Sequence, residues 1–243
     1  MSAADLLLEL RGVHTHIGAY HILHGVDLAV PRGQVTLLLG RNGAGKTTLL
    51  RTIMGLWRAS QGSVQWQGRD IARLATPQIA QLGIAYVPEN MGVFADLTVQ
   101  ENLLLAARGA RNAQQIDGAR LAWIFQLFPA VEKFWHHPAG KLSGGQKQMV
   151  AVARAIVEPR DLLIVDEPSK GLAPSIINNM IDAFAQLKAG GVTILLVEQN
   201  LNFAQRLGDG VAVMDNGRTV HTGSMAELAG DAALQRSLLG LTL

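Results

Sequence analysis

The residues best suited to chemistry form one short segment in the first quarter of the chain. It runs through Gly40, Arg41, Asn42, Gly43, Ala44, Gly45, Lys46, Thr47 and Thr48. Glycines at this spacing let the backbone wrap closely around phosphate groups, and the helix expected at Thr47–Met54 adds its positive N-terminal end. In such a phosphate loop Lys46 lies at the β- and γ-phosphates and the Thr47 hydroxyl can bind Mg²⁺. The segment therefore predicts binding of a nucleoside triphosphate with Mg²⁺.

Two carboxylates follow a second apolar run. Asp166 and Glu167 come directly after Leu162–Val165, four aliphatic residues typical of a buried strand. In open α/β sheets ligands bind at the carboxyl ends of the strands, so both side chains are expected at a ligand site. Beside a phosphate loop, Asp166 is suited to hold Mg²⁺ through its water shell. Glu167 is suited to act as general base for the water that attacks the γ-phosphate.

A third segment combines a hydroxyl with two glycines at the start of a helix. Ser143, Gly144, Gly145 and Gln146 precede a helix predicted at Lys147–Val157, with Ser143 as its N-cap. A plain cap is one interpretation and a second anion site is the other. One nucleotide cannot easily contact both this segment and the phosphate loop of the same chain. The simplest arrangement is a head-to-tail dimer in which each Ser143 contacts the γ-phosphate held by the other subunit.

The elements that position these segments alternate along the chain. Strand-like runs separated by helical segments predict an α/β fold with a mainly parallel sheet. The first 30 residues differ, because Leu6–Ile17 and Val26–Val30 resemble antiparallel strands joined through Gly18–His24. Residues of about 98–140 look entirely helical, and their aromatic side chains predict a small helical core inserted into the α/β core. The runs and the aromatic residues are Gln34–Leu39, Ile84–Val87, Leu162–Val165, Val192–Val197, Val211–Met214, Trp123, Phe125, Phe128, Phe134 and Trp135.

The composition restricts the class of protein. Apolar residues make up 49% of the 243 residues and charged residues 16%, which excludes disorder and a coiled coil. A net charge of +2 is too balanced for nucleic-acid binding, and the absence of cysteine excludes disulfides and thiolate zinc sites. The mean hydropathy of +0.20 raises the question of a membrane protein. No apolar run approaches the roughly 18–20 residues of a spanning helix, so the chain is expected to sit against a membrane rather than cross it.

The phosphate loop, the sequence LSGGQ and the sequence LLIVDEP together resemble the ATP-binding subunits of ABC transporters over essentially the whole chain. The resemblance implies a P-loop NTPase of the ABC type, a single domain over residues 1–243. It implies a β and RecA-like core at about 1–97 and 158–243, with an antiparallel β subdomain and a parallel-sheet core. A helical subdomain at about 98–157 is expected to present LSGGQ and the surface that receives the permease.

The same resemblance implies the partners and the location. Two ATPase subunits would form an ATP sandwich docked on separate membrane-spanning permease subunits, at the cytoplasmic face of the membrane. Hydrolysis of ATP with Mg²⁺ would then drive transport, and a substrate-binding protein would take part indirectly. The permease is expected to sense dimer closure through the region from Glu89 to about Asn102.

Four positions depart from the common ABC pattern. Glu89 stands where Gln is usual, as a candidate Mg²⁺ ligand that adds negative charge. Gln199 stands where most relatives have a histidine at the γ-phosphate, and it can donate a hydrogen bond but cannot become cationic. The segment Ser169–Pro174 lacks the usual Leu-Asp ending. Ile17 falls at the position expected to stack on adenine, with His16 and Tyr20 nearby, which leaves the stacking residue open.

The motifs VPE, SKGLAPS and VEQN, in single-letter code, are similar to one of the two ATPases of branched-chain amino-acid importers. Those systems pair this subunit with a second, different ATPase, so a heterodimer is expected and a homodimer stays possible. Urea and short-amide importers use similar subunits and remain an alternative, as does a soluble ABC-type nucleotide switch. A GTPase or small-molecule kinase would lack LSGGQ.

Two weaker candidates lie outside these motifs. His14 and His16 alternate on a predicted strand without carboxylate or thiolate partners, which does not favour a metal site. Arg154 follows LSGGQ on the same helix and is expected to be a structural ion-pair partner rather than an arginine finger.

Overall fold

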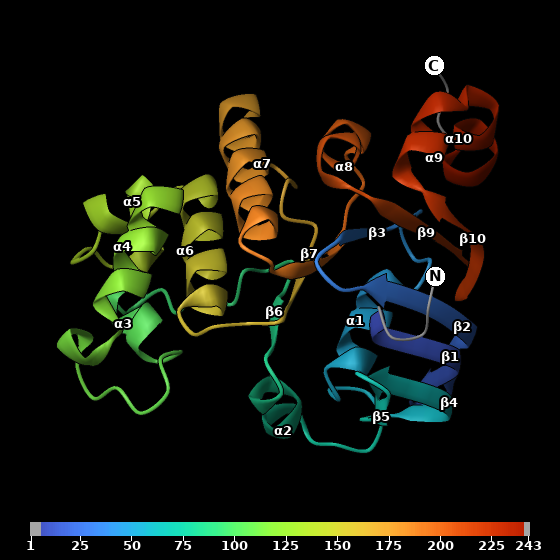
Figure 1. The fold of residues 1–243 in the computed structure, drawn as a ribbon, viewed down its shortest axis with the longest axis horizontal. Coiled ribbons are helices and arrows are strands. Elements are labelled where there is room, and N and C mark those ends of the chain that lie inside the picture. The colour runs from blue at the N-terminus through green and yellow to red at the C-terminus, as the bar shows by residue number, and fades with distance from the viewer. Residues whose placement is uncertain (1–5, 241–243) are drawn as a thin grey trace.

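The computed structural model describes residues 6–240, and its central element is a six-stranded sheet (Figure 1). Its strand order is β10-β9-β3-β8-β7-β6, parallel except for β10, which pairs antiparallel with β9. Every residue of β7 and β8 is buried, as expected for parallel strands covered on both faces. The five predicted core strands are all present. The strands are β3 (Val35–Gly40), β6 (Ile84–Val87), β7 (Leu162–Asp166), β8 (Thr193–Val197), β9 (Gly210–Asp215) and β10 (Arg218–Ser224).

A second sheet is antiparallel, with the order β2-β1-β4-β5. Its strands are β1 (Leu6–Ile17), β2 (Tyr20–Pro31), β4 (Ala59–Trp66) and β5 (Arg69–Asp70). The prediction for the second strand was wrong by six residues, because β2 begins at Tyr20 and only a tight turn at Gly18 and Ala19 separates it from β1. Its first two residues, Tyr20 and His21, are exposed, and Ile22 and Leu23 stand side by side between two histidines, so the apolar alternation that marks a strand in the sequence is missing.

The helices lie on both sides of the central sheet (Figure 1). Helices α3 to α6 gather at one end of the molecule, with the antiparallel sheet at the other end. Short 3₁₀ turns at Ala113–Gln115 and Ala139–Lys141 interrupt the helical part. The helices are α1 (Lys46–Ile53), α2 (Thr76–Gln81), α3 (Val99–Leu104), α4 (Gly118–Leu127), α5 (Pro129–Lys133), α6 (Gly144–Ile156), α7 (Pro174–Ala189), α8 (Leu201–Leu207), α9 (Met225–Gly230) and α10 (Ala232–Leu239).

The predicted aromatic core of the helical part is confirmed in part. Phe128 is buried, and the other four aromatic side chains are partly buried and pack against the same apolar cluster. The rings of Phe125 and Trp135 meet edge to face, with their centroids 5.2 Å apart. This cluster continues into α6, α7 and one face of the central sheet, so the helical part has no separate core.

A second apolar cluster joins α1 to both sheets, through residues such as Leu23, Leu49 and Leu50. It fixes the start of α1, and hence the phosphate loop, against two sheets at once.

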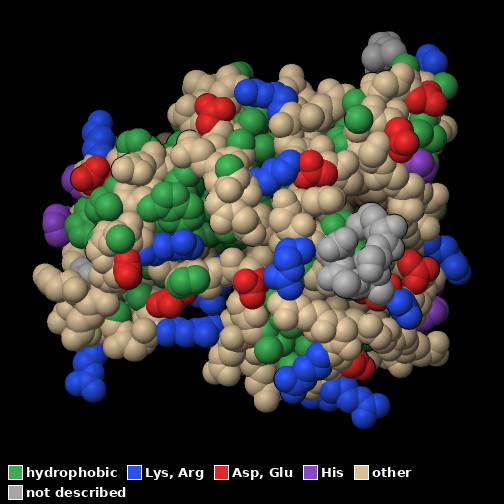
Figure 2. Space-filling model, in the orientation of Figure 1, with side chains coloured by type: hydrophobic (Ala, Val, Ile, Leu, Met, Phe, Trp, Pro, Cys, Tyr) green, Lys and Arg blue, Asp and Glu red, His purple; other side chains and the backbone are tan. Residues whose placement is uncertain are grey.

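The surface drawn in Figure 2 has Lys and Arg interspersed with Asp and Glu over most of the face, and apolar side chains gather over the helical part. Within residues 6–240, no helix is both long and apolar enough to span a bilayer.

Candidate nucleotide-binding site

The phosphate loop connects β3 to α1 and is shaped by its glycines. Gly40, Gly43 and Gly45 have φ angles of 145°, 82° and 99°, in the region that disfavours side chains. A Cβ atom on Gly40 would lie 2.2 Å from the carbonyl oxygen of Met214. The loop can therefore take this course only with glycine at its first position.

The Lys46 side chain is buried and folded back onto this loop. Its Nζ donates to the carbonyl oxygens of Gly40, at 2.8 Å, and Arg41, at 3.1 Å. Burial lowers the pKa of Lys46, while the nearby carboxylates of Glu167 and Asp166 oppose that shift. The loop opens into a cavity of about 260 Å³. The cavity is lined by Ile22, Asn42, Gly43, Ala44, Gly45, Lys46, Thr47, Thr48, Glu89, Glu167 and Lys170.

Asp166 ends β7 beside Thr47, and only 1% of its surface is exposed. Burial raises the pKa of Asp166, and the nearby Thr47 and Tyr86 hydroxyls oppose this shift. The Tyr86 hydroxyl donates to Oδ2 at 3.4 Å, but Oδ1 has no hydrogen-bond partner. A buried carboxylate oxygen without a partner, next to a threonine hydroxyl, has the oxygen-donor chemistry that suits Mg²⁺ and its bound water.

Glu167 adopts a left-handed backbone conformation, with φ at 51°, and its N–H donates to the Val197 carbonyl at 2.9 Å. Such a conformation is uncommon outside glycine and is found at functional sites. Gln199 Nε2 donates to Glu167 Oε1 at 2.5 Å and to Asn42 Oδ1 at 2.8 Å. The structure thus brings together the predicted base, the predicted histidine substitute and the phosphate loop.

Glu89 reaches the cavity from the loop after β6, but its carboxylate already has a partner. Lys170 Nζ lies 2.5 Å from Glu89 Oε1 and 3.6 Å from Glu167 Oε2. The hydrogen bond to Glu89 raises the pKa of Lys170.

Glu198 is buried next to Ser169, the residue before Lys170, and it accepts four hydrogen bonds. They come from the N–H and hydroxyl of Ser169, at 3.0 and 2.7 Å, and from the N–H groups of Gln199 and Asn200, at 3.1 and 3.2 Å. Burial raises the pKa of Glu198, and these hydrogen bonds oppose the shift. The carboxylate ties the segment after Glu167 to the segment that presents Gln199.

The segment Ser143–Gln146 does not line this cavity. Helix α6 begins at Gly144, three residues before the predicted start, and Ser143 is its N-cap as predicted. Ser143 Oγ accepts from Gln146 N–H at 3.3 Å, and Gln146 Oε1 accepts from Ser143 N–H at 2.9 Å. Within one chain, the phosphate loop and Ser143–Gln146 are two separate anion-binding candidates.

The β1–β2 hairpin contacts the cavity through Ile22 rather than through Ile17, which pairs with Tyr20 at the hairpin end. The rings of His16 and His21 stack at 4.1 Å between centroids. Among the described residues, no group of three or more His, Cys, Asp or Glu side chains has the arrangement of a metal site.

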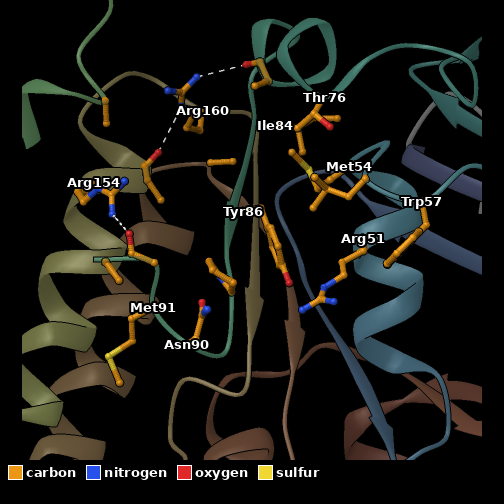
Figure 3. Close-up of a pocket in the computed structure, with 18 residues that line it drawn as sticks. Arg51, Met54, Trp57, Thr76, Ile84, Tyr86, Asn90, Met91, Arg154 and Arg160 are labelled. Carbon is orange, nitrogen blue, oxygen red and sulfur yellow. Dashed lines mark hydrogen bonds between the residues drawn. The ribbon is translucent and has the colours of Figure 1, made fainter. Parts of the chain in front are cut away.

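A larger groove of about 730 Å³ lies between β6, α1, α2 and α6 (Figure 3). Arg51, Arg154 and Arg160 reach it from different elements, and neither Asp nor Glu is among its lining residues. Tyr86 lines the same groove, and burial raises the pKa of its hydroxyl to about 12. Its hydroxyl contacts Asp166, so the ring connects the groove to the carboxylate site.

The expected ion pair of Arg154 is wrong. Within the described part of the chain it has no carboxylate partner, and it donates instead to the Gly92 carbonyl and lies over the Phe94 ring, 5.0 Å from its centroid. The arginine is structural, but a carbonyl and a ring take the place of a carboxylate.

The family model described as ABC transporter matches residues 23–170. The chain belongs to the ABC transporter family. The branched-chain amino acid transport ATP-binding protein BraG of Pseudomonas aeruginosa is 38% identical, over 96% of this chain and all of that protein. The probable branched-chain amino acid transport ATP-binding protein LivF of Archaeoglobus fulgidus is 36% identical, over 96% and 99%.

Solved ABC cassettes have the same fold. A nucleotide-free ATP-binding cassette is 26% identical with a TM-score of 0.80, over 94% of this chain and 97% of that one. A cassette in its ADP conformation is 27% identical with a TM-score of 0.79, over 94% and 96%.

Several residues at this ABC protein's site were not identified as site residues from the sequence. Lys170 and Glu198 lie in the SKGLAPS and VEQN motifs, but neither residue was given a role in the site. Ile22 and Tyr86 carry no motif. For Glu198 there was a signal, because a carboxylate at the end of an apolar strand is also what identified Asp166.

Proposed function

We propose that this chain is the ATP-hydrolysing, energy-coupling subunit of an ABC importer for branched-chain amino acids. The observation behind the catalytic part is that Lys46, Thr47 and Glu167 line one cavity. Asp166 lies beside Thr47, and Gln199 donates a hydrogen bond to Glu167. The names of the relatives from P. aeruginosa and A. fulgidus support the class of substrate.

The phosphate loop, from Gly40 to Thr48, would hold the ATP phosphates with its N–H groups and the N-terminus of α1. Thr47 and Asp166 would hold Mg²⁺, and Glu89 would join them through a metal-bound water. Bound Mg²⁺ neutralises charge on the phosphate oxygens. Lys46 would exchange its two loop carbonyls for phosphate oxygens, so its ammonium is already within the loop before the nucleotide arrives.

Glu167 would take the proton from the attacking water. Gln199 donates to one Glu167 oxygen, which holds the carboxylate in place and leaves the other oxygen for the water. Gln199 also donates to Asn42, so the position of the base is tied to the phosphate loop.

The site would be completed by a second ATPase subunit. Ser143 and Gly145 lie apart from the phosphate cavity of their own chain, at the start of α6, where Ser143 is exposed and Gly145 is buried. In a head-to-tail pair they would contact the γ-phosphate bound by the partner. A second, different ATPase is the expected partner, and a homodimer is the alternative outcome of the test below.

The groove lined by Arg51, Arg154 and Arg160, called the arginine groove below, would receive the permease at the cytoplasmic face of the membrane. Leu56, Phe94 and Leu105 are each at least half exposed at or near the groove, which is unusual for large apolar side chains. Arg51, Arg154 and Arg160 favour an amphipathic permease segment with acidic side chains. The buried Asn102 holds the Phe94 backbone from both sides, at 2.9 and 3.0 Å, so the segment after Glu89 can move as one unit.

The test of the catalytic assignment is Glu167→Gln in the purified subunit. ATP binding should persist, while hydrolysis should fall by about 10²- to 10⁴-fold because the general base is lost. Full turnover by this variant would remove Glu167 from its role. Slow hydrolysis by the unmodified subunit alone is expected for a heterodimer, and brisk turnover without a partner would indicate a homodimer.

Uptake by cells that lack the gene tests the substrate. Labelled leucine uptake should fall and return with the intact gene but not with the Glu167→Gln gene. Unchanged leucine uptake with lost urea uptake would identify the alternative importer class.

A further inference from the structure

We propose that the Lys170 ammonium is the counter-ion of Glu89 before the nucleotide binds, and that it has to leave Glu89 when Mg²⁺ binds there. This inference rests on the proposed function, and it concerns a residue that no motif assigns. Lys170 Nζ lies 2.5 Å from Glu89 Oε1 and 3.6 Å from Glu167 Oε2, inside the lining of the phosphate cavity. Its ammonium therefore contacts one proposed Mg²⁺ ligand and the proposed base at the same time.

The charges around the cavity explain why a cation is needed at this place. Three carboxylates lie at or beside the cavity. Glu89 and Glu167 line it, and Asp166 lies next to them. Lys46 is held by two loop carbonyls. Lys170 supplies the second positive charge, and it contacts the two more exposed carboxylates rather than the buried Asp166. Carboxylates that share a site repel one another, so an ammonium between two of them stabilises both charged forms.

The backbone that bears Lys170 is fixed, whereas its side chain is free to move. Ser169 is buried and donates twice to Glu198, and the Lys170 N–H donates to the Glu167 carbonyl at 3.2 Å. The Lys170 side chain is 60% exposed, and Glu89 is 45% exposed. Displacement of the ammonium therefore requires rotation of one exposed side chain and no change in the chain path.

Competition and simple attraction make opposite predictions. If Lys170 mainly attracts phosphate, its removal weakens nucleotide binding with or without Mg²⁺. If Lys170 competes with Mg²⁺ for Glu89, its removal strengthens the contribution of Mg²⁺ to binding, even where binding without Mg²⁺ becomes weaker. The ratio of the two dissociation constants separates these cases.

The experiment measures binding of AMPPNP, a non-hydrolysable ATP analogue, by calorimetry in Mg²⁺ and in EDTA. The measured quantity is Kd in EDTA divided by Kd in Mg²⁺. Lys170→Met keeps the length of the side chain without its charge and should raise this ratio by about two- to fivefold, the range of an exposed ion pair. A ratio that is unchanged or lower in Lys170→Met would overturn the proposal.

Two controls make the result specific. Lys133→Met removes an exposed lysine on α5, in the helical part, and should leave the ratio unchanged. In a Glu89→Gln background, Lys170→Met should have little further effect on the ratio, because the shared partner is absent. An equal rise in that background would also overturn the proposal.

The same experiment also tests the proposed function separately from this inference. An unmodified chain that binds no AMPPNP in either buffer would refute the proposed function and this inference with it. Binding by the unmodified chain with an unaltered ratio in Lys170→Met would refute the inference alone.

Discussion

Replacement of Asp166 by asparagine should make the nucleotide-free protein more stable while it weakens the Mg²⁺ site. Asp166 is 1% exposed, and its Oδ1 has no hydrogen-bond partner. An unsatisfied buried polar atom costs about 1–3 kcal/mol, and more when it is charged. The asparagine side chain has nearly the same shape and no charge, although its NH₂ group also needs a partner. We therefore expect a net gain of about 1–2 kcal/mol in the free energy of unfolding at neutral pH.

The pH dependence follows from the direction of the pKa shift. Burial raises the pKa of Asp166 in the folded protein above the value of the unfolded chain. The folded form therefore loses stability as the pH rises from the unfolded pKa through the folded one, since the buried group has to ionise. The advantage of Asp166→Asn should be complete above the folded pKa and should vanish below about pH 4, where the carboxyl is protonated in both states.

The assay is thermal unfolding in EDTA, followed by circular dichroism. For a chain of this size, a gain of about 1–2 kcal/mol raises the Tm by about 2–8 °C. Asp161→Asn, at the exposed position directly before the same strand, is the matched control and should change stability by less than about 0.5 kcal/mol. With Mg²⁺ and AMPPNP present, the unmodified protein should have the higher Tm, because it binds Mg²⁺ and AMPPNP more tightly than Asp166→Asn does and gains more stability from them.

A lower Tm for Asp166→Asn than for the unmodified protein in EDTA at neutral pH would refute this reasoning. It would mean that Asp166 is satisfied and stabilising without a metal. An advantage that persisted unchanged in acid would refute the electrostatic origin of the effect.

Two further predictions concern the phosphate loop and its neighbour. Gln199→Ala removes the hydrogen bonds to Glu167 and Asn42, so hydrolysis should fall by about tenfold or more with nucleotide affinity nearly unchanged; equal turnover in a phosphate-release assay would show that the base needs no support from this side chain. Gly40→Ala forces a Cβ against the Met214 carbonyl, so it should lower the free energy of unfolding in urea by about 2–4 kcal/mol and abolish AMPPNP binding. Gly118→Ala, with open space around it, should be neutral, and a neutral Gly40→Ala would contradict the loop geometry.

The parts of the site predicted from the sequence are those whose residues are neighbours in the chain. The phosphate loop and the Asp166–Glu167 pair each combine a strand and reactive side chains within fourteen residues or fewer, so local pattern was sufficient. The start of α6 was placed three residues late, because two glycines have low helix propensity. Here the reciprocal hydrogen bonds of Ser143 and Gln146 begin the helix despite them.

Contacts between distant residues could not be predicted from the sequence. Lys170 and Glu89 are 81 positions apart, and neither residue indicates the other. The segment Tyr20–His24 of the hairpin reads as a loop in the sequence, because its two aliphatic residues are adjacent rather than alternating and its pairing with β1 runs through the backbone. Strand β4 was missed as well, since its first residues are polar or half-exposed and only its end is apolar and buried. Arg154 shows the same limit, because a carbonyl and a ring replaced the expected carboxylate.

The four hydrogen bonds on Glu198 have a consequence for how this protein can evolve. Two of them come from Ser169, one from its N–H and one from its hydroxyl, so loss of the Glu198 carboxylate alone leaves the buried Ser169 hydroxyl without its partner. Positions 169 and 198 should therefore covary among relatives, and a lineage that loses the carboxylate should also lose the hydroxyl. A path on which Glu198 changes first runs through a destabilised intermediate, which would keep this pair together in a lineage long after neighbouring loop residues have diverged.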